Sequence, residues 1–206
     1  MMELSVTQFV TIDGVYQAPG GPEEDPSGGF THGGWSAPYG EEAFGEFIIS
    51  VFERADAFLL GRRTYEIFAG YWPHHNPPGH PIANKLNDLP KYVPTGTLEK
   101  ADWSGTELLH GDLVKEVTEL KARPGRELQV HGSGALAQSL LAADLVDTLN
   151  LWICPVVLGT GKRFFAENAR PTAFTVTESR ITPKGAILVT YRKQGAPTYG
   201  TVGAED

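Results

Sequence analysis

Two spacings of apolar residues alternate along the chain, and they predict strands followed by helices. Strands are predicted at residues 4–12, 56–60, 91–93, 127–131 and 146–153, where apolar residues form short runs or alternate with polar ones. Apolar residues at helical spacing predict amphipathic helices at residues 41–54, 112–121 and 135–142. Two late strands, 173–179 and 186–192, flank a Thr-Pro-Lys-Gly turn and predict a hairpin. This order predicts an α/β fold: a mostly parallel twisted sheet with flanking helices and an antiparallel C-terminal hairpin.

Two segments between these elements are rich in glycine and proline and are predicted to be loops. Residues 17–40 separate the first strand from the first helix. Loops of this length inside a compact domain are usually functional, so we expect a lid that is more mobile without ligand. Residues 71–81 carry three histidines without a regular ligand face, which predicts an exposed loop and no metal site. We expect one domain, residues 1–193, and a loose tail, residues 194–206.

Two of the predicted strands end in glycine-containing turns that lead into helices. Residues 61–64, Gly-Arg-Arg-Thr, follow the strand at 56–60. The glycine allows close approach of a ligand, and the arginines and the helix N-terminus favour a phosphate. A plain turn with solvated arginines explains this motif equally well when it is taken alone. Residues 132–134, Gly-Ser-Gly, follow the strand at 127–131, and the two turns together predict an extended phosphate-bearing ligand across the end of a parallel sheet.

The composition mainly excludes classes of partner. The 206 residues carry a net charge of −8, which argues against nucleic acid because binding its backbone requires a basic face. No apolar run approaches the roughly 20 residues of a membrane helix. Cys154 is the single cysteine, so an intrachain disulfide is impossible and a reducing cytoplasm fits. The first residues lack the basic and apolar regions of a signal peptide, so we expect a cytoplasmic protein that binds a small molecule.

Six short motifs, in order along most of the chain, carry a resemblance to a known family. They are Asp13-Gly14; Leu60-Gly61-Arg62-Arg63-Thr64-Tyr65-Glu66; Lys91-Tyr92-Val93 with Thr95, Thr97 and Leu98; Val130-His131-Gly132-Ser133-Gly134; Leu145-Val146-Asp147; and the run from Pro155 to Phe165. On these residues the chain resembles the dihydrofolate reductase-like superfamily, in particular the reductase (C-terminal) domain of the bacterial riboflavin-biosynthesis deaminase–reductase. The motifs are specific for the superfamily and not for a substrate.

The resemblance implies a nicotinamide cofactor, NADPH, and assigns residues to it. The arginine turn would hold the phosphates of the adenosine half, and the second turn would bind the pyrophosphate through backbone N–H groups. The implied cofactor-binding residues are Gly61, Arg62, Arg63, Thr64, Thr95, Gly132, Ser133, Gly134, Ala135 and Leu136. Many relatives have arginine where this chain has Gly96, which leaves NADH open as a cofactor. Relatives are also commonly homodimers, and Trp152 is a candidate interface anchor.

Candidate catalytic and substrate-binding residues each have a simpler explanation. Glu46 stands nearest the carboxylate on the first helix of dihydrofolate reductases, but a solvated helix face explains it better. Asp13 ends a strand and could bind substrate or nicotinamide, or form an Asp-Gly turn. His131 could line the pocket as a proton donor or be a core histidine. Trp35 could stack on a planar substrate or anchor packing, and Pro155 is a further substrate candidate.

These residues support one leading hypothesis and two alternatives. The first is an NADPH-dependent oxidoreductase that transfers hydride to a C=N or C=O carbon of a small polar heterocyclic or sugar-derived substrate, similar to a riboflavin-precursor reductase. It would act without a zinc deaminase, because a single cysteine cannot supply the Pro-Cys-x-x-Cys motif. The alternatives are dihydrofolate reductase activity and a non-catalytic nucleotide-binding protein that kept the fold.

Overall fold

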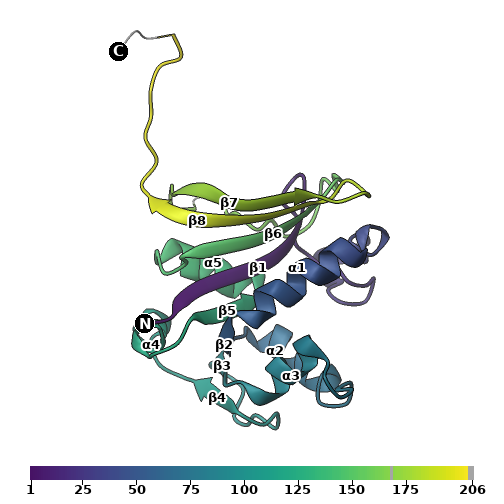
Figure 1. The fold of residues 1–206 in the computed structure, drawn as a ribbon, viewed down its shortest axis with the longest axis vertical. Helices are drawn as coiled ribbons and strands as arrows, with labels where there is room; N and C mark the ends of the chain where they lie inside the picture. Colours follow the sequence, from purple (N-terminus) through teal and green to yellow (C-terminus); the bar gives the residue numbers. More distant parts are fainter. Residues whose placement is uncertain (168, 204–206) are drawn as a thin grey trace.

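The computed structural model describes residues 1–167 and 169–203, which form a single eight-stranded sheet flanked by helices (Figure 1). The strand order is β4-β3-β2-β5-β1-β6-β8-β7. Neighbouring strands from β4 to β6 pair in parallel, whereas β8 pairs antiparallel with both β6 and β7. This confirms the predicted α/β fold with a mostly parallel sheet and an antiparallel C-terminal hairpin.

The helices and strands have the following bounds. The strands are β1 Glu3–Thr11, β2 Ala55–Leu59, β3 Lys91–Pro94, β4 Thr106–Leu109, β5 Glu127–His131, β6 Thr148–Cys154, β7 Ala173–Ile181 and β8 Ile187–Gly195. The helices are α1 Glu42–Glu53, α2 Arg62–Tyr71, α3 Pro81–Asp88, α4 Leu113–Ala122 and α5 Gly134–Ala142. Within the described residues, none of these helices has the length and apolar character needed to cross a membrane.

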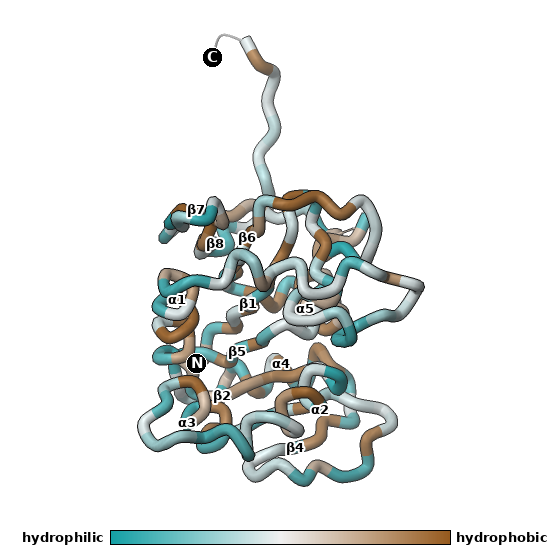
Figure 2. The backbone as a smooth tube through the Cα atoms, turned by 90° about the vertical axis from the view of Figure 1, so that its right-hand side faces the viewer, coloured by the Kyte–Doolittle hydropathy of each residue, from teal (hydrophilic) through white to brown (hydrophobic). Residues whose placement is uncertain are grey.

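Two apolar layers, one on each face of the sheet, hold the elements together. Val117 and Leu120 of α4 and Leu140 of α5 belong to one layer. The other layer joins α1, α2 and α3 to the opposite face through Val51, Phe52, Tyr65 and Leu86. The central strands are buried on both faces, and their polar positions are buried with the apolar ones, as all five residues of β5 show. Figure 2 shows hydrophobic and hydrophilic stretches alternating along the chain.

The structure contains two elements that the apolar pattern did not predict. Helix α3 begins at the end of the loop predicted at 71–81, where the His80 ring nitrogen accepts a hydrogen bond from the Ala83 N–H at 3.2 Å and caps the helix. Strand β4 is four residues long and lies at the edge of the sheet. Both elements are too short for a clear period, so their burial against β3 and α1 decides their conformation.

Trp152 lies inside the molecule and does not reach the surface. Its side chain is 3% exposed and stacks on Phe44 of α1 with 3.9 Å between ring centroids. Phe9 of β1 packs against the same ring edge-on at 4.9 Å. The expectation that Trp152 anchors a dimer interface is therefore wrong, because α1 covers this residue. A homodimer stays a prediction that needs another surface.

The chain leaves the sheet at the end of β8. This strand ends at Gly195, slightly beyond the predicted domain boundary at residue 193. Residues 196–203 form no helix or strand and extend away from the sheet (Figures 1 and 2). The last part of the predicted tail, 204–206, lies outside the described residues.

Lys91 is a fully buried lysine that links α3 to β3. Its Nζ donates to the backbone carbonyls of Leu86 at 2.8 Å, Leu89 at 2.9 Å and Asn87 at 3.3 Å. Burial lowers the pKa of Lys91 to about 8, against an opposing effect of Asp88, so the amine is protonated at neutral pH. An ammonium group has three N–H donors, which match the three carbonyls left unpaired by the end of α3.

We expect the substitution Lys91→Met to destabilise the protein by about 3 kcal/mol, because buried carbonyls would lose their donors. Urea unfolding at pH 7 would measure the loss. Lys100→Met is the matched control, since the Lys100 side chain is 82% exposed and pairs only with the exposed Asp102. Equal unfolding midpoints for the two variants would contradict a stabilising role for Lys91.

Candidate active site

The two glycine turns predicted from the sequence lie against each other at the carboxyl ends of β2 and β5. These strands are neighbours in the sheet. The Gly61 N–H donates a hydrogen bond to Ser133 Oγ at 2.9 Å. A Cβ atom at Gly61 would lie 3.3 Å from the Ser133 side chain, so a larger residue would push the turns apart. The turns therefore form one continuous surface, from which α2 and α5 both begin.

Both helices start without a side-chain cap, so their first backbone N–H groups are free to bind a ligand. Neither Gly61 nor Ser133 supplies a capping side-chain bond. The first helical bonds run from Tyr65 N–H to the Gly61 carbonyl and from Ala137 N–H to the Ser133 carbonyl. The N–H groups of residues 62–64 and 134–136 precede these bonds in the chain and have no partner within their helices. Two adjacent helix N-termini with unpaired N–H groups form a site for an anion.

A cavity of about 570 Å³ opens beside this surface. Ten residues predicted to bind cofactor or substrate line it, and they are Gly61, Arg62, Arg63, Thr64, His131, Gly132, Ser133, Gly134, Ala135 and Leu136. The remaining wall includes the apolar side chains Phe9, Phe44, Ile48, Phe52, Ile67, Phe68, Trp72, Ile82 and Leu86. The cavity thus joins a polar part beside two helix N-termini to an aromatic part, as a phosphate-bearing ligand with a planar ring requires.

The two arginines of the first turn have different partners. Arg62 pairs with Glu66 one helical turn later, with Nε 2.7 Å from Oε1, and also bonds the Thr97 hydroxyl. Arg63 reaches across to the segment predicted as a lid, where it bonds Asp25 Oδ1 at 2.8 Å and the Glu24 carbonyl at 2.7 Å. Both guanidinium groups border the cavity. Arg62 therefore faces the loop after β3, whereas Arg63 connects α2 to the lid.

Asp25 joins the lid segment to two other parts of the cavity wall. Besides Arg63, its carboxylate accepts from Lys162 Nζ at 2.7 Å. Burial raises the pKa of Asp25, but the bonds from Lys162 and Ser27 outweigh this effect and hold it at about 2. Asp25 is 9% exposed, so its charge depends on these partners for compensation.

The lid segment is also packed from within. Trp35 is 7% exposed, and its Nε1–H donates to the Gln17 carbonyl at 2.8 Å. The Gln17 side chain donates in turn to the carbonyls of Asp25 and Ser27, both at 2.9 Å. Two short 3-10 helices, Ser27–Gly29 and Ala37–Tyr39, give the segment regular turns. Trp35 thus anchors the segment internally and is not among the residues that line the cavity.

Comparison with known proteins agrees with this architecture. Residues 3–188 match the family model of the RibD C-terminal domain. The chain belongs to the RibD C-terminal domain family. This membership supports an oxidoreductase of the type found in riboflavin biosynthesis.

Individual relatives of this RibD-type chain are distant but cover nearly all of it. The uncharacterized protein YyaP of Bacillus subtilis is 25% identical over 192 residues, which span 90% of this chain and 92% of YyaP. A solved structure from Shewanella sp. PV-4, whose name refers to riboflavin biosynthesis, has a TM-score of 0.66 at 21% identity and covers 94% of this chain and 99% of its own. Dihydrofolate reductase from Enterococcus faecalis, solved with NADP(H), has a TM-score of 0.58 at 16% identity, covering 93% and 96%. These two structures show the shared fold.

Four further predicted residues of this RibD-type domain lie outside the cavity lining. Asp13 accepts hydrogen bonds from the Thr11 hydroxyl at 2.6 Å and the Gly159 N–H at 2.9 Å. Burial raises the pKa of Asp13, but these bonds outweigh it and lower the pKa overall. Its carboxylate therefore holds the loop after β6 onto the end of β1, as an Asp-Gly turn would.

The other three residues are also engaged elsewhere. Glu46 is on the exposed side of α1 and pairs with Arg180 of β7 at 2.8 Å, so its carboxylate is not placed to reach a ligand in the cavity. The Thr95 hydroxyl accepts from the Leu98 N–H at 3.0 Å and shapes the loop that Arg62 contacts through Thr97. Pro155 is exposed after β6.

Tyr16 and Lys162 are among the cavity residues that had no role in the sequence-based predictions. Tyr16 packs its ring directly on the second turn, and a Cβ atom at Gly134 would lie 2.2 Å from that ring. Lys162 borders the cavity and bonds Asp25. Lys162 belongs to the Gly-Thr-Gly-Lys run at 159–162, so a basic residue in that motif was the available signal. The contact of Tyr16 with Gly134 joins residues far apart in sequence and left no local signal.

We expect Asp25→Asn to loosen the lid segment, because Arg63 and Lys162 would lose their shared carboxylate. Hydrogen exchange over residues 17–40 should become faster than in the wild type. The folded pKa of Asp25 is about 2 against an ordinary 3.8. Its stabilising contribution is therefore present above pH 4 and lost as the pH falls through 2.

Chemical unfolding of the wild type and of Asp25→Asn at a series of pH values would test this sign. The difference in unfolding free energy should be largest near neutral pH and vanish in acid. Asp102→Asn is the control, since Asp102 pairs with Lys100 at the surface. A difference that grows as the pH falls would contradict the assigned role of Asp25.

Proposed function

We propose that this protein is a reductase that uses NADPH, with NADH as an alternative cofactor. The observation that carries the proposal is the meeting of two uncapped helix N-termini at one side of a single cavity. Such a pair of helix starts suits the linked phosphates of a dinucleotide, because each offers unpaired N–H groups and the positive end of a helix dipole. Membership of the RibD C-terminal domain family supports the same class of activity.

The residues at the polar part of the cavity fit the phosphates of such a cofactor. Gly61 and Gly132 have no Cβ, so a phosphate can approach the backbone of both turns. Arg62 and Arg63 border this part and carry guanidinium groups that can bind phosphate oxygens in pairs. Arg62 lies beside the loop that holds Thr95 and Thr97, which is the side we assign to the adenosine half.

The aromatic part of the cavity fits the reacting rings. Phe9, Phe44 and Phe52 line it and provide the apolar surface that would exclude water from a bound ring. When bound, NADPH supplies the hydride, and the protein contributes orientation and a dry environment. We propose a small polar heterocyclic or sugar-derived substrate with a C=N or C=O carbon, similar to the 5-amino-6-(5-phosphoribosylamino)uracil of riboflavin biosynthesis.

A non-catalytic nucleotide-binding protein is the second candidate. The acidic residues that line the cavity within the described chain are Glu24 and Asp25, and both belong to the lid segment. Asp25 is already paired with two cations. The aromatic part thus lacks a carboxylic acid that could protonate a substrate, and this favours binding without turnover. It also disfavours dihydrofolate reductase activity, because Glu46 points to the exposed side of α1.

We expect replacement of both Arg62 and Arg63 by alanine to weaken NADPH binding by roughly a hundred- to ten-thousand-fold, because each of the two charge-assisted bonds contributes about 1.5–3 kcal/mol. Single variants titrated with NADPH and NADH would separate the two roles. An arginine on the 2′-phosphate should matter for NADPH and hardly for NADH, whereas one on the pyrophosphate should matter equally for both. Fluorescence titration of the reduced cofactor gives the affinities.

Arg180→Ala is the matched control, since Arg180 is equally exposed but pairs with Glu46 away from the cavity. Its affinity for both cofactors should equal that of the wild type. If neither cofactor binds the wild type at millimolar concentration, the reductase proposal fails. If both bind and the double variant binds them unchanged, the phosphates lie elsewhere. Cofactor binding without turnover of any carbonyl or imine substrate would favour the second candidate.

A further inference from the structure

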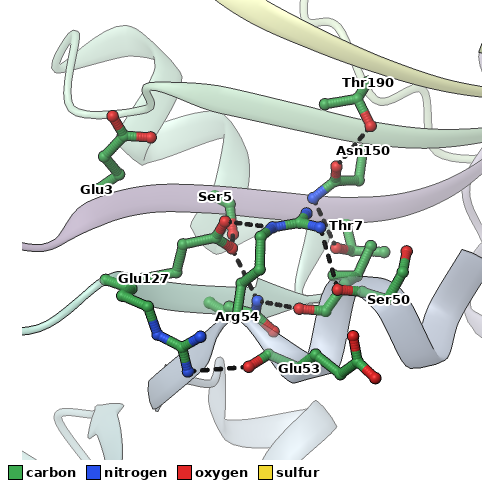
Figure 3. A network of polar contacts seen from close by, with 12 residues as sticks. Glu3, Ser5, Thr7, Ser50, Glu53, Arg54, Glu127, Asn150 and Thr190 are labelled. Carbon is green, nitrogen blue, oxygen red and sulfur yellow. Dashed lines mark hydrogen bonds and ion pairs between the residues drawn. The ribbon is translucent and has the colours of Figure 1, made fainter. Parts of the chain in front are cut away.

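A row of buried polar side chains runs under α1 and ends at the cavity. Its members on β5 are Glu127, Gln129 and His131, which alternate along the strand and therefore share one face of the sheet. Arg54, just after α1, begins the row at the surface (Figure 3). Polar groups in such a place are costly unless each has a partner, so the bonds between them are strongly constrained.

Glu127 and the Val51 carbonyl fix the orientation of the Gln129 amide. One Glu127 carboxylate oxygen accepts a hydrogen bond from Arg54 Nε at 2.6 Å, and the other accepts one from the Ser5 hydroxyl at 2.9 Å. Gln129 Nε2 lies 2.8 Å from that same Glu127 oxygen and 2.7 Å from the Val51 carbonyl. A carboxylate and a carbonyl can only accept, so the amide nitrogen of Gln129 must face them. The amide oxygen of Gln129 therefore faces His131.

This orientation decides which nitrogen of His131 carries a proton. His131 Nε2 lies 3.0 Å from Gln129 Oε1, and an amide oxygen can only accept. Nε2 must then donate its N–H. Burial lowers the pKa of His131 to about 3, so the ring is neutral at ordinary pH and has a single N–H. Phe52 stacks on the ring with 4.3 Å between centroids and holds its orientation.

The second nitrogen of the ring is consequently an unprotonated acceptor. No described residue makes a hydrogen bond to His131 Nδ1. Among the described residues, Nδ1 without a partner is not fully buried, so it borders open space. The ring lines the cavity, which is the open space at this end of β5. The charged members of the row, Arg54 and Glu127, pair with each other and compensate their own charges.

We propose that His131 selects the ligand of this cavity as a fixed hydrogen-bond acceptor, with Nδ1 receiving an amide or amino N–H. Ligands without such a donor would leave the nitrogen unpaired, which disfavours them by roughly ten- to hundred-fold in affinity. The donor can come from the carboxamide of a nicotinamide or from a ring amide of the substrate. This assignment deepens the proposed function and rests on it for the identity of the ligand. It replaces the role of proton donor, because the available nitrogen has no proton to give.

Nitrogen NMR of the free protein labelled with 15N-histidine tests the tautomer directly. His131→Phe assigns the resonances. We expect one protonated nitrogen, Nε2, and one unprotonated nitrogen, Nδ1, with no change between pH 5 and pH 8. A proton on Nδ1, or a charged ring in this range, would overturn the proposal. This measurement needs no cofactor, so it stands even if NADPH does not bind.

The substitution Gln129→Met tests how the tautomer is set. Methionine is close to glutamine in size but has no amide, so His131 Nε2 loses the oxygen to which it donates. We expect the second tautomer of His131 to become populated, an effect that a purely structural role of Gln129 would not produce. Circular dichroism would verify that the variant is folded. An unchanged tautomer in the folded variant would overturn the proposed control of His131 by Gln129.

Two matched pairs of probes identify the source of the donor. NADP⁺ has a carboxamide, whereas its 3-acetylpyridine analogue has no N–H there. In the same way, 2-pyridone has a ring N–H and N-methyl-2-pyridone does not. If the carboxamide is the source, NADP⁺ moves the Nδ1 resonance and its analogue does not. If a substrate amide is the source, 2-pyridone added with NADP⁺ moves it and the methylated form does not. An Nδ1 resonance that responds to neither pair would overturn the proposal.

Discussion

The hydrogen bond between the Gly61 N–H and Ser133 Oγ marks the contact on which the candidate site depends. It joins two strand-to-helix turns that are far apart in the chain but follow neighbouring parallel strands. Parallel strands bring their carboxyl ends to one edge of the sheet, and the helices that follow begin there. Because the turns touch, their N–H groups border one cavity.

Two groups of charged side chains near the cavity are compensated in different ways. At its mouth, Asp25 binds Arg63 and Lys162 and so connects the lid segment to α2 and to the loop after β6. Beneath the cavity, the charges of Arg54 and Glu127 compensate each other. The neutral side chains of Gln129 and His131 continue the row of hydrogen bonds from Glu127 to the cavity. The second arrangement is mostly buried, and hydrogen bonds join its members to one another, which constrains the orientation of each group.

Much of the fold could be predicted from local patterns, and the exceptions have a physical cause. The apolar residues of β1 and β5 are spaced as in strands, so the local sequence identifies both elements. Strand β4 and helix α3 are short, and half of their residues are polar, so packing against neighbours stabilises them more than any local pattern. Trp152 illustrates the same limit, since an apolar strand residue can face a partner molecule or a covering helix, and here α1 covers it.

The sequence by itself determined the two glycine turns and their arginines, because backbone conformation at a strand-to-helix junction depends on adjacent residues. Only the tertiary structure decided which polar residues reach the cavity. Asp13, Glu46 and Trp35 are bonded to other parts of the chain, whereas Lys162 and Tyr16 border the ligand space. The acceptor on His131 depends on partners contributed by α1, β1 and β5. Such contacts join residues that are distant in sequence, so no local pattern encodes them.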